Sequence, residues 1–434
     1  MKKIHLKNTT RYYIVVVLVF FFLFLSGDFG LVDVQKTAIV MAVGIDREDD
    51  TFILTSQIAV PQASKQGDAT QTVQLVSRGK TVADAFDEIN AKTGWYPKLV
   101  FCHLLILGEK TTEQNVFEAL DFFLLDEYMP DNCLVATCEG VAKDLLNVTA
   151  LVDPSGSLAI QKVLSQHAQR VGTAMPSTLR EFAIGYFSDA KSGFLPVVKT
   201  QPQQEKIQGE NGQAGQGGES GGQNGGQNGS SGGSPSGSPS GGQSGSSSGG
   251  GQSGQKSQSG NSETDKPVFS ASETALFVGG IKKDVFTEEE TFAYNAVKND
   301  LKLASYTVKT EENFCSLSVK NNDSKIKLNY HDGGRATLRI DVIMSAGLLD
   351  YSGSLGLENV TDGGDVPSGA FTSAEKLLSS QIVTAFEKCR LCACDLFGVG
   401  ERMQKYKPRA YKEYKDSLLQ NATYEIHVKF RNIR

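Results

Sequence analysis

The sequence predicts an α+β protein with mixed, largely antiparallel sheets and packed helices in two or three lobes, plus an N-terminal transmembrane helix. Three observations predict this class: β-rich runs mixed with amphipathic helical stripes, a long Gly/Ser/Gln segment, and an apolar run near the start. The 434 residues have room for two or three domains. The formal net charge of −6 gives no sign of a nucleic-acid-binding protein, which would carry a basic stripe.

Residues 12–25 form an aliphatic and Phe-rich run that follows four basic residues, Lys2, Lys3, Lys7 and Arg11. This order keeps the N-terminus in the cytoplasm and directs the rest of the chain across the membrane. The run covers only about 21 Å of the ~30 Å hydrocarbon core as a helix, but an extension to Val32 completes a span. We expect residues 1–32 to form a cytoplasmic basic stub and an uncleaved signal-anchor helix; a cleaved signal is the alternative. The expected anchoring side chains are Tyr12, Ile14, Val17, Phe20, Phe22 and Leu25.

The triplet Leu25-Ser26-Gly27 is typical of the sequence before a lipid-modified cysteine, but position 28 holds aspartate. Asp28 has no thiol, so diacylglycerol cannot be attached there by the usual route. The segment is therefore lipoprotein-like without a lipidation site. The bulk of the chain is expected on the extracytoplasmic face of the membrane.

Residues 33–200 are expected to form an N-terminal α/β domain. Its last part, 153–200, is mostly helical and either caps this domain or begins another. The domain opens with two β-rich runs, 37–45 and 51–60, which an acidic turn separates, as in a hairpin.

A helix is expected after this hairpin, because Thr81 and Asp84 resemble a capping box. Its apolar stripe is Val82, Ala85, Phe86 and Ile89. The other elements expected in this half are strands at 71–76, 98–107 and 133–138, and helices at 113–128, 141–148, 158–168 and 178–186.

Residues 201–266 are expected to be a disordered tether, because Gly, Ser, Gln and Asn dominate them. Such a segment cannot bury enough surface to offset its ordering entropy. A flexible coil of this length reaches roughly 40–50 Å. Two alternatives stay open: the flanking parts move independently, or the segment is an insertion into a loop of one fold.

Residues 267–434 are expected to form a C-terminal α+β domain with a sheet that has one wet face. Thr372 and Glu375 predict a capping box for a long helix that runs to about Leu396 and stops at Gly398. The other expected elements are strands at 273–280, 303–309, 315–320, 325–330, 336–344 and 423–430, a turn and helix at 284–300, and a helix at 410–419.

Cysteines and histidines offer the nearest approach to a reactive or metal-binding motif. Cys389, Cys392 and Cys394 have a metal-like spacing, but on a helix Cys394 lies on another face than Cys392, and no second pair completes a tetrahedron. Cys102 and His103 are adjacent in an expected strand, so they point to opposite faces and cannot pair as nucleophile and base. We therefore expect packing roles and predict no catalytic, metal or cofactor-binding residue.

Several stretches resemble, in the same order, the spore-germination Ger(x)C proteins. They are 38–46 (AIVMAVGID), 79–86 (GKTVADAF), 101–109 (FCHLLILGE), 275–282 (ALFVGGIK) with Glu290 and Thr291, and 395–401 (DLFGVGE). Two features depart from the family pattern: Asp28 stands where a lipidated cysteine is usual, and the tether is not typical.

The resemblance implies a non-catalytic C subunit of a nutrient germinant receptor, anchored at the spore inner membrane. It implies integral-membrane A-type and B-type subunits as partners and a role in receptor assembly and germination signalling. An autonomous extracytoplasmic ligand-binding protein and an envelope signalling subunit are the alternatives, and an envelope enzyme with an unrecognised site is a third.

Overall fold

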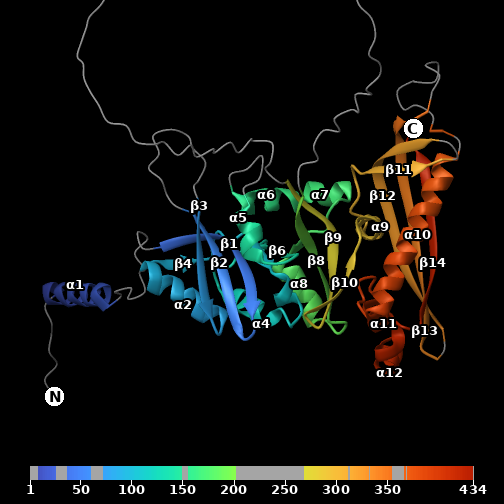
Figure 1. Ribbon diagram of the computed structural model, residues 1–434. Coiled ribbons are helices and arrows are strands. Elements are labelled where there is room, and N and C mark those ends of the chain that lie inside the picture. Colours follow the sequence, from blue (N-terminus) through green and yellow to red (C-terminus); the bar gives the residue numbers. More distant parts are fainter. Residues whose placement is uncertain are drawn as a thin grey trace, which may run out of the picture. The chain divides into compact units, whose positions relative to one another are not determined.

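The computed structural model describes residues 8–25, 37–59, 72–148, 155–201, 268–310, 313–331, 333–353, 366–367 and 369–433. Two sheets and the helices packed on them make up the folded body (Figure 1). The expected α+β fold class is confirmed.

The larger sheet has ten strands in the order β10-β9-β8-β6-β5-β1-β2-β3, with β4 beside β1 and β7 beside β6. β1 pairs antiparallel with β2 but parallel with β4 and β5, so the direction of pairing changes there. The strands are β1 (Thr37–Glu48), β2 (Thr51–Ala59), β3 (Thr72–Gly79), β4 (Tyr96–Lys98), β5 (Leu104–Leu107), β6 (Leu134–Cys138), β7 (Ser177–Thr178), β8 (Ser192–Gln201), β9 (Val268–Val278) and β10 (Ile281–Phe286).

Helices cover both faces of this sheet. Side chains of α2, α4 and α8 pack into one core, and those of α5 and α6 pack into another. In β5, Leu105 and Leu107 enter the first core while Leu104 and Ile106 enter the second, which explains its continuous apolar sequence. The helices are α2 (Val82–Thr93), α3 (Glu109–Thr112), α4 (Phe117–Leu125), α5 (Ala142–Asn147), α6 (Gly156–Val163), α7 (Gln166–Val171) and α8 (Leu179–Phe187).

The hairpin and capping box expected near the start are confirmed. β1 and β2 pair through Glu48↔Thr51. The Thr81 hydroxyl accepts a hydrogen bond from the Asp84 amide, and the Thr81 amide donates to the Asp84 carboxylate, each at 3.1 Å. The apolar stripe of α2 is buried as expected.

Two longer elements expected in this half are wrong. The strand expected at 98–107 is two strands, because the chain turns between β4 and β5 and the Cys102 amide donates to the Leu99 carbonyl at 2.7 Å. The helix expected at 113–128 is α4 alone. Its first turn begins only after Asn115, whose side chain accepts from the Phe117 amide at 3.1 Å.

The strands that flank the segment 203–265, β8 before it and β9 after it, are neighbours in the large sheet. β8 and β9 pair antiparallel, with the register running from Ser192↔Val278 to Gln201↔Val268. Residues 1–202 and 266–434 belong to one compact unit. Of the two alternatives for the tether, this pairing supports an insertion into a loop of one fold.

The second sheet has four strands in the order β11-β12-β13-β14. β13 pairs antiparallel with β12 but parallel with the closing strand β14. α10 packs on β14 and α9, and the core between them holds Tyr294, Phe386 and Phe397. The elements are α9 (Glu288–Lys298), β11 (Ser305–Lys309), β12 (Phe314–His331), β13 (Arg335–Tyr351), α10 (Ala370–Leu391), α11 (Val399–Tyr406), α12 (Pro408–Leu418) and β14 (Ala422–Asn432).

The separate strands expected at 315–320 and 325–330 are one strand, β12. The polar residues between them do not turn the chain; they form an irregularity in the pairing with β13, between Val319 and Asn321. Asn322 is buried there and its side-chain amide donates to the Ala296 carbonyl at 2.7 Å.

The long helix expected to end near Leu396 is also corrected. α10 begins after Gly369, and Glu375, expected in a capping box, instead accepts from the Phe430 amide at 2.9 Å. α10 ends at Leu391, and Gly398 precedes α11 with φ 69° instead of stopping α10.

The apolar N-terminal run forms helix α1 (Asn8–Leu25). Its described side chains are exposed, among them Tyr12 and Phe20 at 75% and 70%. In the described part of the chain, no helix is long and apolar enough to cross a membrane. The extension to Val32, on which the expected span depended, lies outside the described residues, as does Asp28.

Candidate functional site

Of the three cysteines near the end of α10, Cys394 packs against the large sheet. Cys389 is in α10, whereas Cys392 and Cys394 follow it, so the helical argument for their separation does not apply. The Cys394 thiol donates to the Phe277 carbonyl at 3.4 Å, which places it against β9. Hydrogen bonding to Cys389 and burial raise the pKa of Cys394, so this thiol stays protonated.

Cys102 and His103 lie in the turn before β5, not inside a strand. The Cys102 thiol is buried and donates to the Leu104 carbonyl at 3.8 Å. Burial lowers the pKa of His103, and its Nε2 has no hydrogen-bond partner. Across the described ranges, no group of three or more His, Cys, Asp or Glu side chains is arranged to hold a metal ion.

Two of the stretches that carried the family resemblance meet at Asp46. Its carboxylate accepts from the amides of Ala142 and Lys143, at 2.7 and 3.1 Å, and so caps α5. Burial raises the pKa of Asp46, and these two hydrogen bonds oppose the rise. Gly108 is required beside it, because a Cβ atom there would collide with Asp46 Oδ1. Sequence reasoning missed this contact, although the glycine and the aspartate were both in the quoted stretches.

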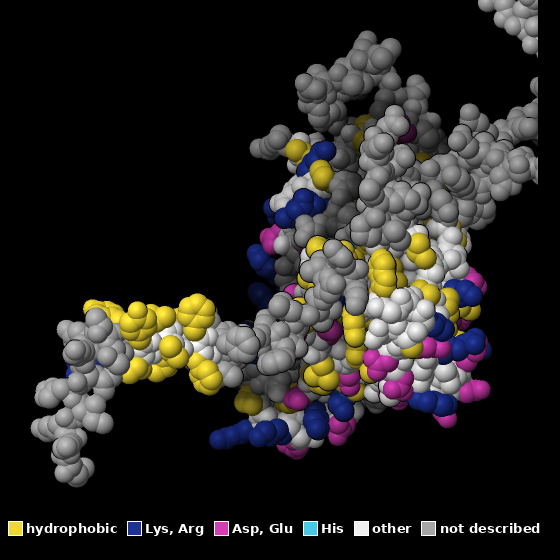
Figure 2. All heavy atoms as spheres, turned by 90° about the vertical axis from the view of Figure 1, so that its left-hand side faces the viewer, with side chains coloured by type: hydrophobic (Ala, Val, Ile, Leu, Met, Phe, Trp, Pro, Cys, Tyr) yellow, Lys and Arg dark blue, Asp and Glu magenta, His cyan; other side chains and the backbone are white. Residues whose placement is uncertain are grey.

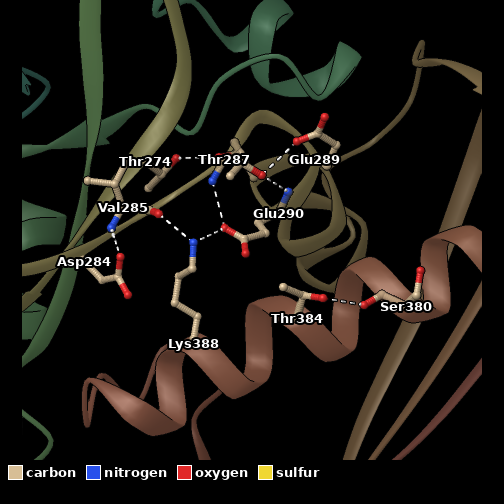
Figure 3. A network of polar contacts seen from close by, with 10 residues as sticks. Thr274, Asp284, Val285, Thr287, Glu289, Glu290, Ser380, Thr384 and Lys388 are labelled. Carbon is tan, nitrogen blue, oxygen red and sulfur yellow. Dashed lines mark hydrogen bonds and ion pairs between the residues drawn. The ribbon is translucent and has the colours of Figure 1, made fainter.

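A second polar centre connects α10 to the large sheet. Lys388 Nζ contacts Glu290 Oε2 at 2.6 Å and the Val285 carbonyl at 2.9 Å (Figure 3). The same Glu290 oxygen accepts from the Thr287 amide at 2.8 Å and completes the capping box of α9. Glu290 and Lys388 are only 6% and 22% exposed at their side chains. One carboxylate thus starts α9 and also fixes α10 against β10.

The last of the family-like stretches, 395–401, forms the loop before α11 and the first residues of that helix. Asp395 accepts from the Val399 amide at 2.8 Å and the Gly400 amide at 2.6 Å, and its own amide donates to Ser192 Oγ at 2.9 Å. Burial raises the pKa of Asp395, again opposed by its backbone hydrogen bonds. The loop is therefore anchored to the first residue of β8.

This loop forms one wall of a cleft of about 720 Å³. The other walls come from α8 and β8, which precede the tether, and from α9, which follows it. Acidic groups outnumber basic ones: the lining includes Lys298 and the acids Glu181, Asp189, Asp300, Asp395 and Glu401. The cleft is the candidate functional site because elements from both sides of the tether line it, among them the loop at 395–401, whose sequence resembles the family.

The cleft acids already hold parts of the structure in place. Glu181 completes the capping box of Thr178 on α8, and Asp189 accepts from Gln404 of α11 at 2.6 Å. Asp395 accepts from the amides of Val399 and Gly400 and so fixes the start of α11. Such an arrangement can contact a small polar ligand or a segment of a partner, but these carboxylates are positioned to fix helices.

The expected membrane-anchor residues are all in α1. Tyr12, Ile14, Val17 and Phe20 are exposed, whereas the side chains of Phe22 and Leu25 lie outside the described set. Sequence reasoning did not single out Lys388 as functional, because nothing in α10 indicated its partner 98 residues earlier.

Known proteins match the chain on both sides of the tether. A family model described as the spore germination protein N-terminal domain matches residues 31–200, and one described as spore germination B3/GerAC like, C-terminal, matches 272–434. The crystal structure of the GerBC protein superposes with a TM-score of 0.50 over 90% of this chain and 97% of the other, at 14% identity, which shows a shared fold.

Two relatives come from Bacillus subtilis strain 168. The chain is 28% identical to spore germination protein A3 over 185 residues, which cover 41% of this chain and 48% of the relative. It is 28% identical to spore germination protein B3 over 129 residues, which cover 28% and 34%. The chain thus matches about half, or less, of the length of these curated relatives.

The fold and the two family matches together define a spore germination protein. The chain belongs to the Ger(x)C family, and the resemblance predicted from the sequence is confirmed.

Proposed function

We propose that this protein is a non-catalytic, membrane-anchored subunit of a spore nutrient germinant receptor that acts in receptor assembly and germination signalling. The observation that carries the proposal is the pair of family matches, in family order, on a fold like that of GerBC. The buried cysteines and the structural use of the cleft acids favour a role without catalysis.

Anchoring is proposed through α1. Its exposed apolar side chains follow a basic N-terminal stub, the pattern that keeps a short N-terminus in the cytoplasm and the body outside. In this proposal α1 holds the body on the outer face of the spore inner membrane without a lipid chain.

Integral-membrane A-type and B-type receptor subunits are the proposed partners. An epitope-tagged chain, extracted from spores in mild detergent, should co-purify with a multi-span membrane protein. A variant with Phe20→Asp and Val17→Asp in α1 serves as the anchoring control, because two charges in the apolar run oppose membrane insertion. Recovery of the intact chain without any multi-span protein would count against the receptor proposal.

The cleft favours one other candidate function, an autonomous extracytoplasmic ligand-binding protein. Its lining combines aromatic, amide and carboxylate groups, as small-molecule sites do. Thermal unfolding of the purified chain with amino acids, sugars and ions tests it: a raised midpoint with one compound class supports direct binding, and unchanged midpoints contradict it.

A further inference from the structure

One end of the large sheet carries a group of exposed apolar side chains, most of them aromatic. Between α2 and β5, Trp95, Tyr96, Val100 and Phe101 are 39%, 46%, 46% and 61% exposed. Tyr128, which follows α4, is 50% exposed and joins them, because Lys98 Nζ lies 4.7 Å from the centre of its ring. These five residues are called the aromatic patch below.

The aromatic patch lies where the chain from α1 enters the fold. β4 pairs with the first residues of β1 through Thr37↔Tyr96 and Ile39↔Lys98, so the patch flanks the start of β1. Figure 2 faces the end of the sheet at which β3 and β4 lie in Figure 1. It shows hydrophobic side chains on this face, with charged side chains among them in its lower half and along its right-hand edge.

The length of the connection limits how far the patch can lie from α1. Residues 26–36 separate the end of α1 from Thr37. A chain of this length spans at most about 40 Å when fully extended. If α1 is in the bilayer, the patch therefore remains within one domain diameter of the membrane surface.

The chemistry of the aromatic patch suits the boundary between lipid and water. Trp and Tyr combine an apolar ring with a polar group and are enriched at that boundary, where lysine reaches anionic headgroups. Packing within the protein leaves these rings exposed, although burial would stabilise them.

We propose that the aromatic patch docks into the interfacial layer of the lipid bilayer. Docking there orients the ten-stranded sheet with the start of β1 toward the membrane and the second sheet farther along the body. The inference rests on the proposed anchoring of α1 in the membrane.

The chain supplies its own probe, because Trp95 is its one tryptophan. The full chain is reconstituted into vesicles of phosphatidylcholine and phosphatidylglycerol, with and without lipids brominated in the acyl chain close to the headgroup. The emission of Trp95 should shift to shorter wavelength on reconstitution, be quenched by the brominated lipid, and become less accessible to acrylamide in the water.

Vesicle flotation, measured together with the accessibility of Trp95, distinguishes failure of patch docking from failure of membrane anchoring. Vesicles that float with the protein, while Trp95 stays open to acrylamide and insensitive to brominated lipid, would overturn docking but keep the anchor. A chain that does not float with vesicles would overturn anchoring itself. Protection of Trp95 only after a multi-span partner is added would instead identify the patch as a protein interface, and would also overturn docking on lipid.

A pair of phenylalanine variants checks the position of the contact. Phe101→Ser should weaken docking by roughly tenfold, the effect of withdrawing one large apolar side chain from burial, and so reduce quenching by brominated lipid. Phe314→Ser, in β12 of the second sheet, removes a ring of similar exposure (56%) and should leave quenching unchanged. Equal quenching in both variants contradicts the proposal.

Discussion

At the scale of single residues, two aspartates do the same work in different parts of the chain. Asp46 fixes the start of α5 and Asp395 the start of α11, each by accepting two backbone amides with one carboxylate. A short helix leaves its first amides unpaired, so a buried carboxylate there satisfies donors that would otherwise destabilise the fold. Both aspartates lie in stretches that resemble the Ger(x)C family.

The raised pKa of Asp46 predicts a pH dependence of stability. Burial raises the native pKa above the ordinary value of 3.8, and the nearby carboxylates of Asp144 and Glu48 add to the rise. Between the ordinary pKa of 3.8 and the raised pKa of the native state, the native state binds more protons than the unfolded state. The stabilisation from a protonated Asp46 is therefore full below the ordinary value and is lost as pH rises through the native pKa.

Asp46→Asn should remove this dependence. The difference in unfolding free energy between the native protein and the variant should shrink as pH rises above 3.8, measured by denaturant unfolding at several pH values. Asp87→Asn, on the exposed side of α2, controls for the loss of one carboxyl group. A difference that grows with pH in this window would contradict the assignment.

At the scale of elements, local signals were partly readable in the sequence and long-range ones were not. The capping box expected at Thr81 and Asp84 forms, whereas the same pattern at Thr372 and Glu375 lies inside α10 and caps no helix. The sequence did not predict β10, because the charged residues Lys282, Lys283 and Asp284 are unlike a buried strand. An edge strand tolerates such charges. The contact between Lys388 and Glu290 could not be predicted for another reason: the two residues are 98 positions apart, and only folding brings them together.

The contact between Lys388 and Glu290 should stabilise the attachment of α10. Lys388→Met leaves the mostly buried Glu290 without its cation, and we expect a loss of about 1–3 kcal/mol, between the values for exposed and buried ion pairs. Denaturant unfolding of the full chain measures it.

Lys325→Met is the matched control for this contact, because that pair is exposed and its atoms are 3.6 Å apart. It should change the unfolding free energy by less than about 0.5 kcal/mol. Equal losses in the two variants would show that Lys388 contributes no more than a surface charge.

At the scale of the whole molecule, the composition of the tether was visible in the sequence but its place in the fold was not. A Gly/Ser/Gln segment looks the same whether it links two bodies or interrupts a hairpin. Only the register of β8 and β9, which pairs Gln201 with Val268, distinguishes the alternatives. Nothing within either strand specifies its neighbour, because an apolar strand fits beside many others.

Replacement of residues 203–265 by a four-residue turn should therefore preserve the fold. The loop between the paired residues Gln201 and Val268 becomes roughly nine times shorter, and the lower cost of closing it should raise the unfolding free energy by about 2 kcal/mol. A Gly/Ser segment of the original length should leave stability unchanged. Loss of folding, or two separate unfolding transitions in the shortened chain, would contradict the insertion.

The pairing of β8 with β9 also determines what a protease can do to this protein. A cut anywhere in 203–265 severs the polypeptide but not the sheet, since the strand that ends one fragment is hydrogen-bonded to the strand that begins the other. Lys199 adds a charged contact across the same seam, to Glu273 of β9 at 2.8 Å; its second ion pair, with Glu139 at 2.7 Å, lies within the first fragment. A chain cut in this segment therefore becomes a complex of two fragments, held together by the pairing of β8 with β9. The fragments separate only when the large sheet unfolds.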